Sequence, residues 1–136
     1  MLIRELAPGE ENFLLAPWHR NLLSQHSDVA RDVLDAETQP RMQTLLKRRA
    51  VVAVDEPTGL LLGGICYERI RVAPVLHFAY VRRTHRRLGV FRALMERELL
   101  VGAPLLVSMA ANQEAIERTI QCHIYYNPWL FDGVQT

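Results

Sequence analysis

Two periodicities of apolar residues along the chain predict its secondary structure. Short runs rich in β-branched, leucine and aromatic residues, bounded by Gly, Pro or charged residues, are typical of strands. The sequence has five such runs, and the turn EPTG at 56–59 joins two of them into a hairpin. The expected strands are residues 2–6, 50–55, 60–70, 74–81 and 104–110.

Helical spacing dominates the long interval between the first two strands. Residues 10–25 favour a helix that is interrupted at Pro17. Ser27 can cap a second helix over 28–37. The apolar stripe of that helix would consist of Val29, Val33 and Leu34.

A further helix start is indicated by Thr38 and Pro40, and we expect that helix to run over residues 40–49. Its inward-facing side chains would be Met42, Leu45 and Leu46.

Two more helices are predicted in the second half of the chain. One covers 88–101 and is ended by Gly102, and Asn112 begins another over 112–121. The apolar face of the first would consist of Leu94, Met95, Leu99 and Leu100. The tail from residue 123 onward is aromatic and irregular, and it is broken at Asn127-Pro128.

This order of elements predicts an α/β fold with a mixed, mainly antiparallel sheet flanked by helices. The hairpin at 50–70 is antiparallel, whereas the strand–loop–helix–strand unit at 75–110 forms a parallel crossover. A length of 136 residues is typical of one domain, so we expect a single domain over residues 1–136.

Composition narrows the classes of function. The formal net charge is only +1, so bulk charge attracts neither nucleic acid nor an anionic membrane. No apolar run is long enough to cross a membrane, and the start lacks the pattern of a signal peptide. Cys66 and Cys122 lack the spacing of metal ligands. We therefore expect a cytoplasmic protein with two reduced thiols, no metal and no membrane partner.

Positive charge is nevertheless concentrated at one place. Five arginines fall between Arg82 and Arg92, directly after the strand at 74–81 and before a helix. The first N–H groups of a helix have no partner within it, and the helix dipole adds positive charge there. Gly89 lets a ligand approach the backbone, while Arg86 and Arg87 can bind phosphate oxygens. The segment therefore predicts a pyrophosphate site.

At this segment the chain resembles the GNAT superfamily of N-acetyltransferases. The stretch YVRRTHRRLGVFRALM is similar to that family's acyl-CoA motif, Gln/Arg-x-x-Gly-x-Gly/Ala, with Phe91 where the family has Gly or Ala. The resemblance implies the family's fold, acetyl-CoA as co-substrate and transfer of an acetyl or small acyl group to an amine. The cofactor-binding residues that it implies are Tyr80, Val81, Arg86, Arg87, Leu88, Gly89, Val90 and Phe91.

The resemblance also implies how the cofactor is held. The edge of the strand at 77–81 would pair with the pantetheine arm, and a backbone N–H near Tyr80 would stabilise the oxyanion. The Phe91 side chain can either crowd the phosphates or point into the core and leave the backbone donors free.

Candidates for acid–base chemistry lie outside this motif. Family members commonly protonate the departing thiolate with a tyrosine near the end of the last helix, which points to Tyr125 or Tyr126. Asn127-Pro128 fixes the chain after Tyr126 and slightly favours it. Aligning Asn112-x-x-Ala115 with the family's Asn-x-x-Ala instead puts Thr119 at that place. The general base would be Glu68 or His77, directly or through a water.

The chain is short for this family, so the last hairpin is expected to be rudimentary or absent, and the acceptor side open or completed in a homodimer. The compact chain and its YNPWLF end resemble small acetyltransferase-like proteins of bacteriophages. The acceptor would then be an amine on a small molecule, a protein or a modified nucleobase.

Three other interpretations fit the same residues. The arginines can be a solvated basic face, the chain can be a CoA-binding domain without catalysis, or it can be a basic nucleic-acid-binding module. A test of acetyl-CoA binding distinguishes the enzyme from the solvated face and from the nucleic-acid-binding module, because neither of these would bind acetyl-CoA.

Overall fold

The structure, a computed structural model, describes residues 1–109 and 112–132. This part of the chain contains six strands, four α-helices and two short 3-10 helices. In chain order they are β1 (Leu2–Glu5), α1 (Asn12–Gln25), α2 (Arg31–Leu46), β2 (Ala50–Asp55), β3 (Leu60–Arg69), β4 (Pro74–Val81), η1 (Arg83–His85), α3 (Val90–Arg97), β5 (Leu105–Val107), α4 (Gln113–Ile120), β6 (Ile124–Tyr126) and η2 (Pro128–Asp132).

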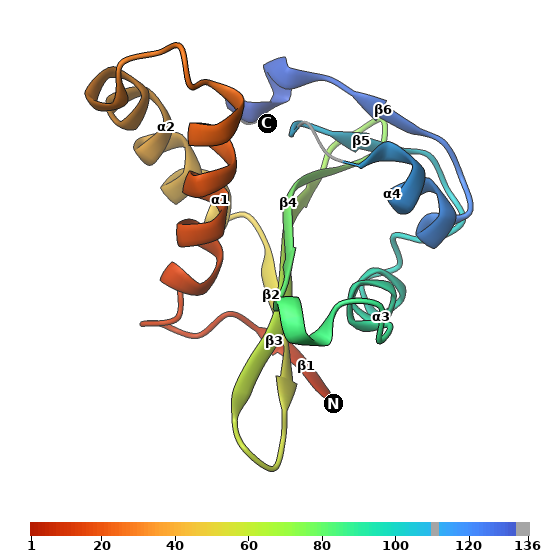
Figure 1. Cartoon of the computed structure of the whole chain (residues 1–136). Coiled ribbons are helices and arrows are strands. Elements are labelled where there is room, and N and C mark those ends of the chain that lie inside the picture. Colours follow the sequence, from red (N-terminus) through yellow and green to blue (C-terminus); the bar gives the residue numbers. More distant parts are fainter. Residues whose placement is uncertain (110–111, 133–136) are drawn as a thin grey trace.

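The six strands form one sheet in the order β1-β2-β3-β4-β5-β6 (Figure 1). The ladders from β1 to β4 are antiparallel, and those of β4 with β5 and β5 with β6 are parallel. The predicted α/β class with a mixed, mainly antiparallel sheet is therefore confirmed. The expected hairpin at 50–70 and the parallel crossover at 75–110 are both present.

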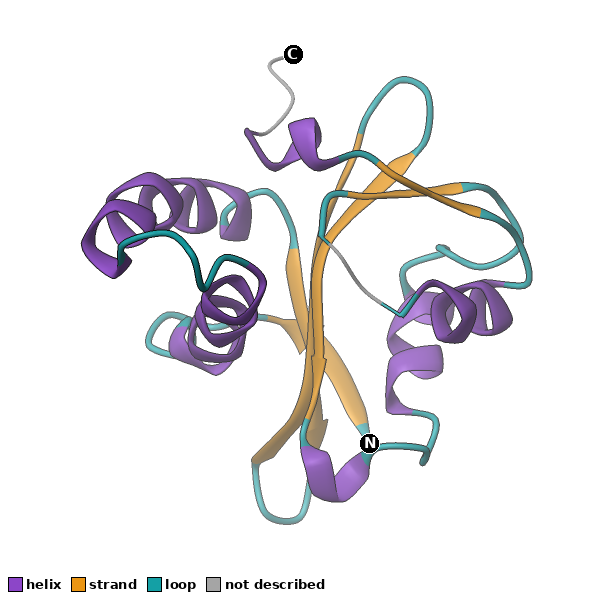
Figure 2. Ribbon diagram, turned by 45° about the horizontal axis from the view of Figure 1, so that its top comes forward, coloured by secondary structure: helices purple, strands orange, loops and turns teal. Residues whose placement is uncertain are grey.

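Helices cover both faces of the sheet. Figure 2 shows α1 and α2 on one face and α3 and α4 on the other. On the first face, Trp18 of α1 stacks on Phe78 of β4 with ring centroids 5.2 Å apart. On the second face, Leu94 and Met95 of α3 pack with Ile116 of α4 in the larger core.

Neither internal proline interrupts a helix, contrary to expectation. Pro17 lies inside α1, and Pro40 lies inside one continuous α2. Each proline removes one backbone donor, which weakens a helix locally. Buried residues on one face of each helix outweigh this loss: α1 buries Leu14, Trp18 and Leu22, and α2 buries Leu34, Thr38, Met42, Leu45 and Leu46.

The predicted start of the second helix was also wrong. Ala30, without a side-chain hydrogen bond, is the N-cap of α2 rather than Ser27. Val29 and Val33 are exposed, so only Leu34 of the predicted stripe reaches the core. The two predicted helices form one helix, and its buried face runs from Leu34 to Leu46 without Val29 or Val33.

In the second half of the chain, the helix and strand differ from the prediction mainly in where they end. Helix α3 ends at Arg97 and not at 101, because Leu99 adopts a left-handed φ of 61° and is exposed. Strand β5 is shorter than the predicted 104–110, of which Ala110 lies outside the described residues. The tail, expected to be irregular, contributes the short strand β6.

A buried carboxylate fixes the end of α3. Glu98 accepts hydrogen bonds from Arg49 Nε at 2.9 Å and from the Tyr67 hydroxyl at 2.8 Å. Its backbone oxygen accepts a bond from Arg69 at 2.6 Å. Burial acts to raise the pKa of Glu98, but the bonds from Arg49 and Tyr67 outweigh it and hold the pKa below its usual range. The network ties the end of α3 to β3 and to the chain before β2.

We expect Glu98→Gln to lower the free energy of unfolding at pH 7 by about 1–3 kcal/mol, because the buried partners lose a charged acceptor. A lowered folded-state pKa adds stability above the unfolded pKa of about 4.3, and this stability disappears as the pH falls through the folded value. The gap between variant and wild type should therefore shrink below about pH 4. Urea unfolding at a series of pH values measures this difference in unfolding free energy.

Glu96→Gln serves as the control. It breaks an exposed pair with Arg92 and should change stability little. An equal gap at every pH would contradict the role of the Glu98 charge.

Candidate functional site

A cavity of about 680 Å³ opens between the second half of β4 and helices α3 and α4. This volume lies in the range typical of small-molecule sites. Among the described residues, β4 pairs with β5 only at Val75 and Leu76. Beyond that point the strands diverge, and Ala79, Tyr80 and Val81 line the cavity. One edge of β4 is thus available to a ligand.

The head of α3 forms the floor of the cavity. Gly89 is its N-cap with a φ of 81°, a conformation that favours glycine, and no side chain caps the helix there. A Cβ added at Gly89 would meet no atom within 4 Å, so the space in front of the helix is open. The first N–H groups of α3 therefore remain available for an anion.

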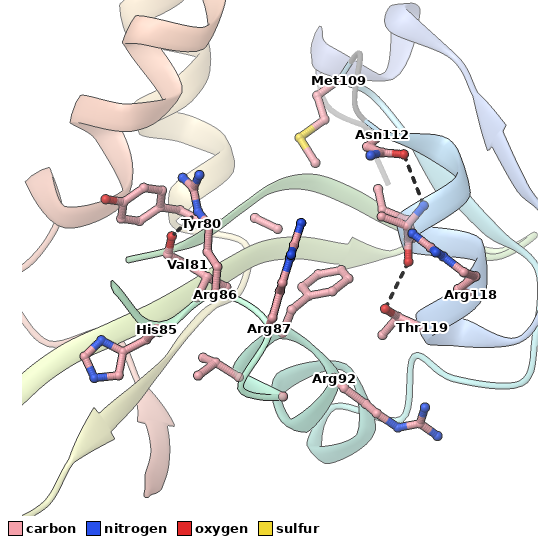
Figure 3. Close-up of a pocket in the computed structure, with 16 residues that line it drawn as sticks. Tyr80, Val81, His85, Arg86, Arg87, Arg92, Met109, Asn112, Arg118 and Thr119 are labelled. Atoms are coloured by element: carbon pink, nitrogen blue, oxygen red, sulfur yellow. Dashed lines mark hydrogen bonds between the residues drawn. The ribbon is translucent and has the colours of Figure 1, made fainter. Parts of the chain in front are cut away.

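Arginines surround this floor. Arg86 donates from Nε to the Val81 oxygen at 3.1 Å, which holds it beside Tyr80 (Figure 3). Arg87, with a left-handed φ of 67°, extends from the loop into the cavity (Figure 3). Leu88 is exposed and is not among the lining residues, unlike its predicted partners Arg86, Arg87, Gly89, Val90 and Phe91.

Phe91 lines the cavity and also packs, partly buried, against the core on the α3–α4 side. Of the two expected arrangements, packing against the core therefore holds, while the ring still forms part of the wall.

Helix α4 forms the opposite wall, and sequence reasoning assigned most of it no role. Asn112 caps this helix, since its Oδ1 accepts a bond from the Ala115 N–H at 3.2 Å. Thr119 lines the cavity with its hydroxyl bonded to the Ala115 oxygen at 3.0 Å. Arg118, a cation absent from the sequence-based candidates, also lines it (Figure 3). The helical spacing from Asn112 was the signal that could have indicated this wall.

The two candidates for the general base lie together, but behind the cavity. His77 Nε2 is 2.6 Å from Glu68 Oε2, and His77 Nδ1 is 2.6 Å from the Ser108 hydroxyl. All three residues are buried, and none lines the cavity. Burial lowers the pKa of His77 more than the hydrogen bond with Glu68 raises it.

The two candidate tyrosines lie apart from the cavity lining. Tyr125 and Tyr126 belong to β6, and their exposed fractions are 56% and 44%. Tyr126 pairs with Val107, which belongs to the core on the α3–α4 side, so alternation places Tyr126 toward that face and Tyr125 toward the other. Neither tyrosine is among the residues that surround the cavity.

Three further observations concern possible metal ligands, the cysteines and membrane-spanning helices. No three His, Cys, Asp or Glu side chains within residues 1–109 and 112–132 are grouped to hold a metal ion. Both cysteines are free thiols. No helix in the same ranges has the length and apolarity of a membrane span.

Solved structures of acetyltransferases have a similar fold. A possible acetyltransferase from Clostridium difficile 630 superposes with a TM-score of 0.52 and 20% identity, covering 86% of this chain and 83% of that one. The ribosomal-protein-alanine N-acetyltransferase from Brucella melitensis biovar Abortus 2308 gives 0.51 and 18%, covering 98% and 84%.

A GCN5-related N-acetyltransferase from Sphaerobacter thermophilus matches 73% of this chain with a TM-score of 0.47 and 16% identity, and the match spans 30% of that longer protein. No protein-family model matches the sequence, and neither does any curated protein. The likeness is therefore one of architecture. The chain therefore shares its fold with these two acetyltransferases, in agreement with the fold that the resemblance implied.

Proposed function

We propose that this protein binds acetyl-CoA in the cavity between β4 and α4 and transfers the acetyl group to an amine. The observation that carries this proposal is the head of α3, where Gly89 leaves the first turn open beside Arg86 and Arg87. Helix N–H groups, a left-handed glycine and two guanidinium groups together suit a pyrophosphate.

The free edge of β4 supports the same ligand. Residues 77–81 have no strand partner on the β5 side among the described residues, so apart from the Val81 oxygen, which accepts from Arg86, their backbone can pair with the amide groups of a pantetheine arm. An extended ligand that starts at the head of α3 and follows this edge reaches the point where β4 and β5 separate. There the thioester carbonyl would lie near the backbone of β4, and an N–H near Tyr80 would stabilise its oxyanion.

The chemical step needs no covalent enzyme intermediate. A neutral amine nitrogen bonds to the thioester carbon, the carbon–sulfur bond breaks, and the amine loses a proton. Glu68 with His77 would accept that proton, and Tyr125 or Tyr126 would protonate the thiolate. Tyr126 is the better candidate, since its register places it on the face that carries the cavity.

The amine acceptor would approach from the face covered by α1 and α2, because the cofactor occupies the other face. The acceptor is proposed to be a small molecule, a protein amine or a modified nucleobase, and the enzyme to act in the cytoplasm, with a homodimer as one way to complete the acceptor side. An origin in a bacteriophage is a further proposal, and it rests on the resemblance of the compact chain and its YNPWLF end.

Titration of acetyl-CoA into the purified protein by calorimetry tests the proposal. We expect micromolar binding at physiological salt. Binding of CoA without turnover on a panel of amines would favour a CoA-binding domain that lacks catalysis. Affinity for DNA or RNA that falls steeply with salt, without affinity for acetyl-CoA, would favour a nucleic-acid-binding module.

Removal of one cavity arginine provides a sharper test. We expect Arg87→Ala to weaken acetyl-CoA binding roughly 10- to 100-fold, the loss of one charge-assisted contact with phosphate. Arg83→Ala removes the same charge from the same loop, but Arg83 does not line the cavity. The affinity of this variant for acetyl-CoA should therefore stay within about twofold of wild type. Equal losses in both variants would mean that only the general charge of the loop matters.

A further inference from the structure

The buried residues Glu68, His77 and Ser108 lie where the sheet divides. Just beyond the ladder between β4 and β5, the Ser108 N–H donates to the Leu76 oxygen at 3.1 Å. His77 follows Leu76 and Met109 follows Ser108, and Met109 already lines the cavity. The hydrogen bond between His77 and Ser108 therefore closes the inner end of the split between the strands.

A bulge places His77 in this position. Cys66 pairs with Phe78 and Tyr67 pairs with Leu76, so His77 is an extra residue on β4 with no partner of its own on β3. Its ring bridges Glu68 on the neighbouring β3 and Ser108 at the end of β5.

The three side chains lie on the face opposite the cofactor cavity. Tyr67 belongs to the core beneath α3 and α4, and Glu68 follows it in β3. Since successive strand residues point to opposite faces, Glu68 points toward the α1–α2 side, and the hydrogen bonds of His77 bring Ser108 next to the same ring. An amine that attacks a thioester held in the cavity would arrive from this side.

The hydrogen bonds define a direction for protons. A carboxylate only accepts, so the Glu68 contact requires the proton of the neutral ring to be on Nε2. His77 Nδ1 is then an acceptor, and the Ser108 hydroxyl donates to it. Two charged side chains affect protonation of the His77 ring. The charge of Glu68 favours it, and the charge of Arg48 opposes it.

We propose that Ser108, His77 and Glu68 form a proton relay in which the Ser108 hydroxyl is the end nearest the acceptor amine. As the nitrogen–carbon bond forms and the carbon–sulfur bond breaks, the amine proton passes to Ser108 Oγ. The Ser108 proton passes to His77 Nδ1, and the Glu68 carboxylate stabilises the resulting imidazolium. The electron pair of the broken bond leaves on the CoA thiolate. The relay rests on the proposed acetyl transfer, to which it adds Ser108 and the order of the proton steps.

The tautomer of His77 tests the direction of the relay without any acceptor. Long-range proton–nitrogen NMR spectra of protein labelled with ¹⁵N-histidine, assigned with His77→Gln, should show a neutral ring with its proton on Nε2. Saturating acetyl-CoA should shift both ring nitrogens. A ring with its proton on Nδ1, a ring charged at neutral pH, or nitrogens unmoved by bound acetyl-CoA would overturn the relay.

Kinetics separate the relay from a structural role. With spermidine and an alanine-initiated peptide as probe amines, Ser108→Ala should lower kcat about 100-fold or more, while the affinity for acetyl-CoA stays within about twofold. Ser108→Thr, which keeps the hydroxyl, should restore most of the loss. Thr38→Val removes a comparably buried hydroxyl that donates to the Leu34 oxygen, and it should lower stability without lowering kcat.

The outcomes of these experiments are distinguishable. Absence of acetyl-CoA binding to the wild type would sink the proposed function itself, whatever the tautomer. Binding and turnover with an unchanged kcat in Ser108→Ala would retain the proposed function and remove the relay. If neither probe amine is acetylated, the NMR response of His77 to bound acetyl-CoA decides the relay.

Discussion

Replacing Gly89 by glutamate should abolish acetyl-CoA binding, with a loss of roughly 100-fold or more. The carboxylate would lie in front of the first turn of α3, where the backbone N–H groups and Arg87 would otherwise face phosphates. Repulsion between like charges and the filled space act in the same direction. Calorimetric titration of the variant beside wild type measures the loss.

Gly59→Glu is a matched control for this substitution. Gly59 also has a left-handed φ, at 74°, and an added Cβ there would meet no atom within 4 Å, as at Gly89. It lies in the turn between β2 and β3, away from the residues that line the cavity. Both variants should lose about 1–2 kcal/mol of stability from backbone strain, and Gly59→Glu alone should keep its affinity. Equal affinities in the two variants would falsify the pyrophosphate site.

Gly63→Ala should damage the same site from a distance. A Cβ on Gly63 would lie 2.9 Å from the Tyr80 oxygen and 3.0 Å from Val90 Cγ1. Since a contact this short forces a shift, the first residue of α3 or the edge of β4 must move. We expect a loss of about 1–3 kcal/mol in stability together with weaker acetyl-CoA binding. Thermal unfolding and calorimetry on one preparation measure both.

The adjacent glycine separates these two effects. A Cβ on Gly64 would be equally crowded, at 3.0 Å from both Leu14 Cδ2 and the Val51 oxygen, but it would point toward α1. Gly64→Ala should therefore lose a similar amount of stability while its affinity for acetyl-CoA stays close to wild type. If both variants lost affinity in proportion to stability, Gly63 would have no specific role in positioning α3.

The strands and the order of elements could be predicted because they depend on short-range patterns. Residues 50–55 and 74–81 are bounded by turn signals and match β2 and β4. The helix ends could not be predicted as well, since they depend on distant partners. The buried bonds of Glu98 with Arg49 and Tyr67 accompany an end of α3 that its own sequence does not mark.

The candidate site likewise has a part that could be predicted from the sequence and a part that could not. The phosphate-binding loop is contiguous in sequence, so Arg86, Arg87 and Gly89 could be identified from their motif. The helical spacing from Asn112 indicates the helix that carries Arg118, but Arg118 reaches the cavity only because α4 packs beside α3, which no local pattern marks. The sequence offers Glu68 and His77 as alternatives, whereas the structure joins them through one hydrogen bond and adds Ser108, which directly follows β5.

The sheet order also has a consequence for how the protein folds. Each strand pairs with the next one along the chain, so strand pairing is as local as the connections between the strands allow, which favours faster folding. The ladder between β4 and β5 has only two residue pairs, so this seam between two strands is the shortest ladder in the described part of the sheet. A ligand that contacts β4 on one side and α4 on the other would span this seam and raise the unfolding free energy by mass action. Backbone amides of β5, α4 and β6 should then exchange with deuterium more slowly in the complex than in the free protein.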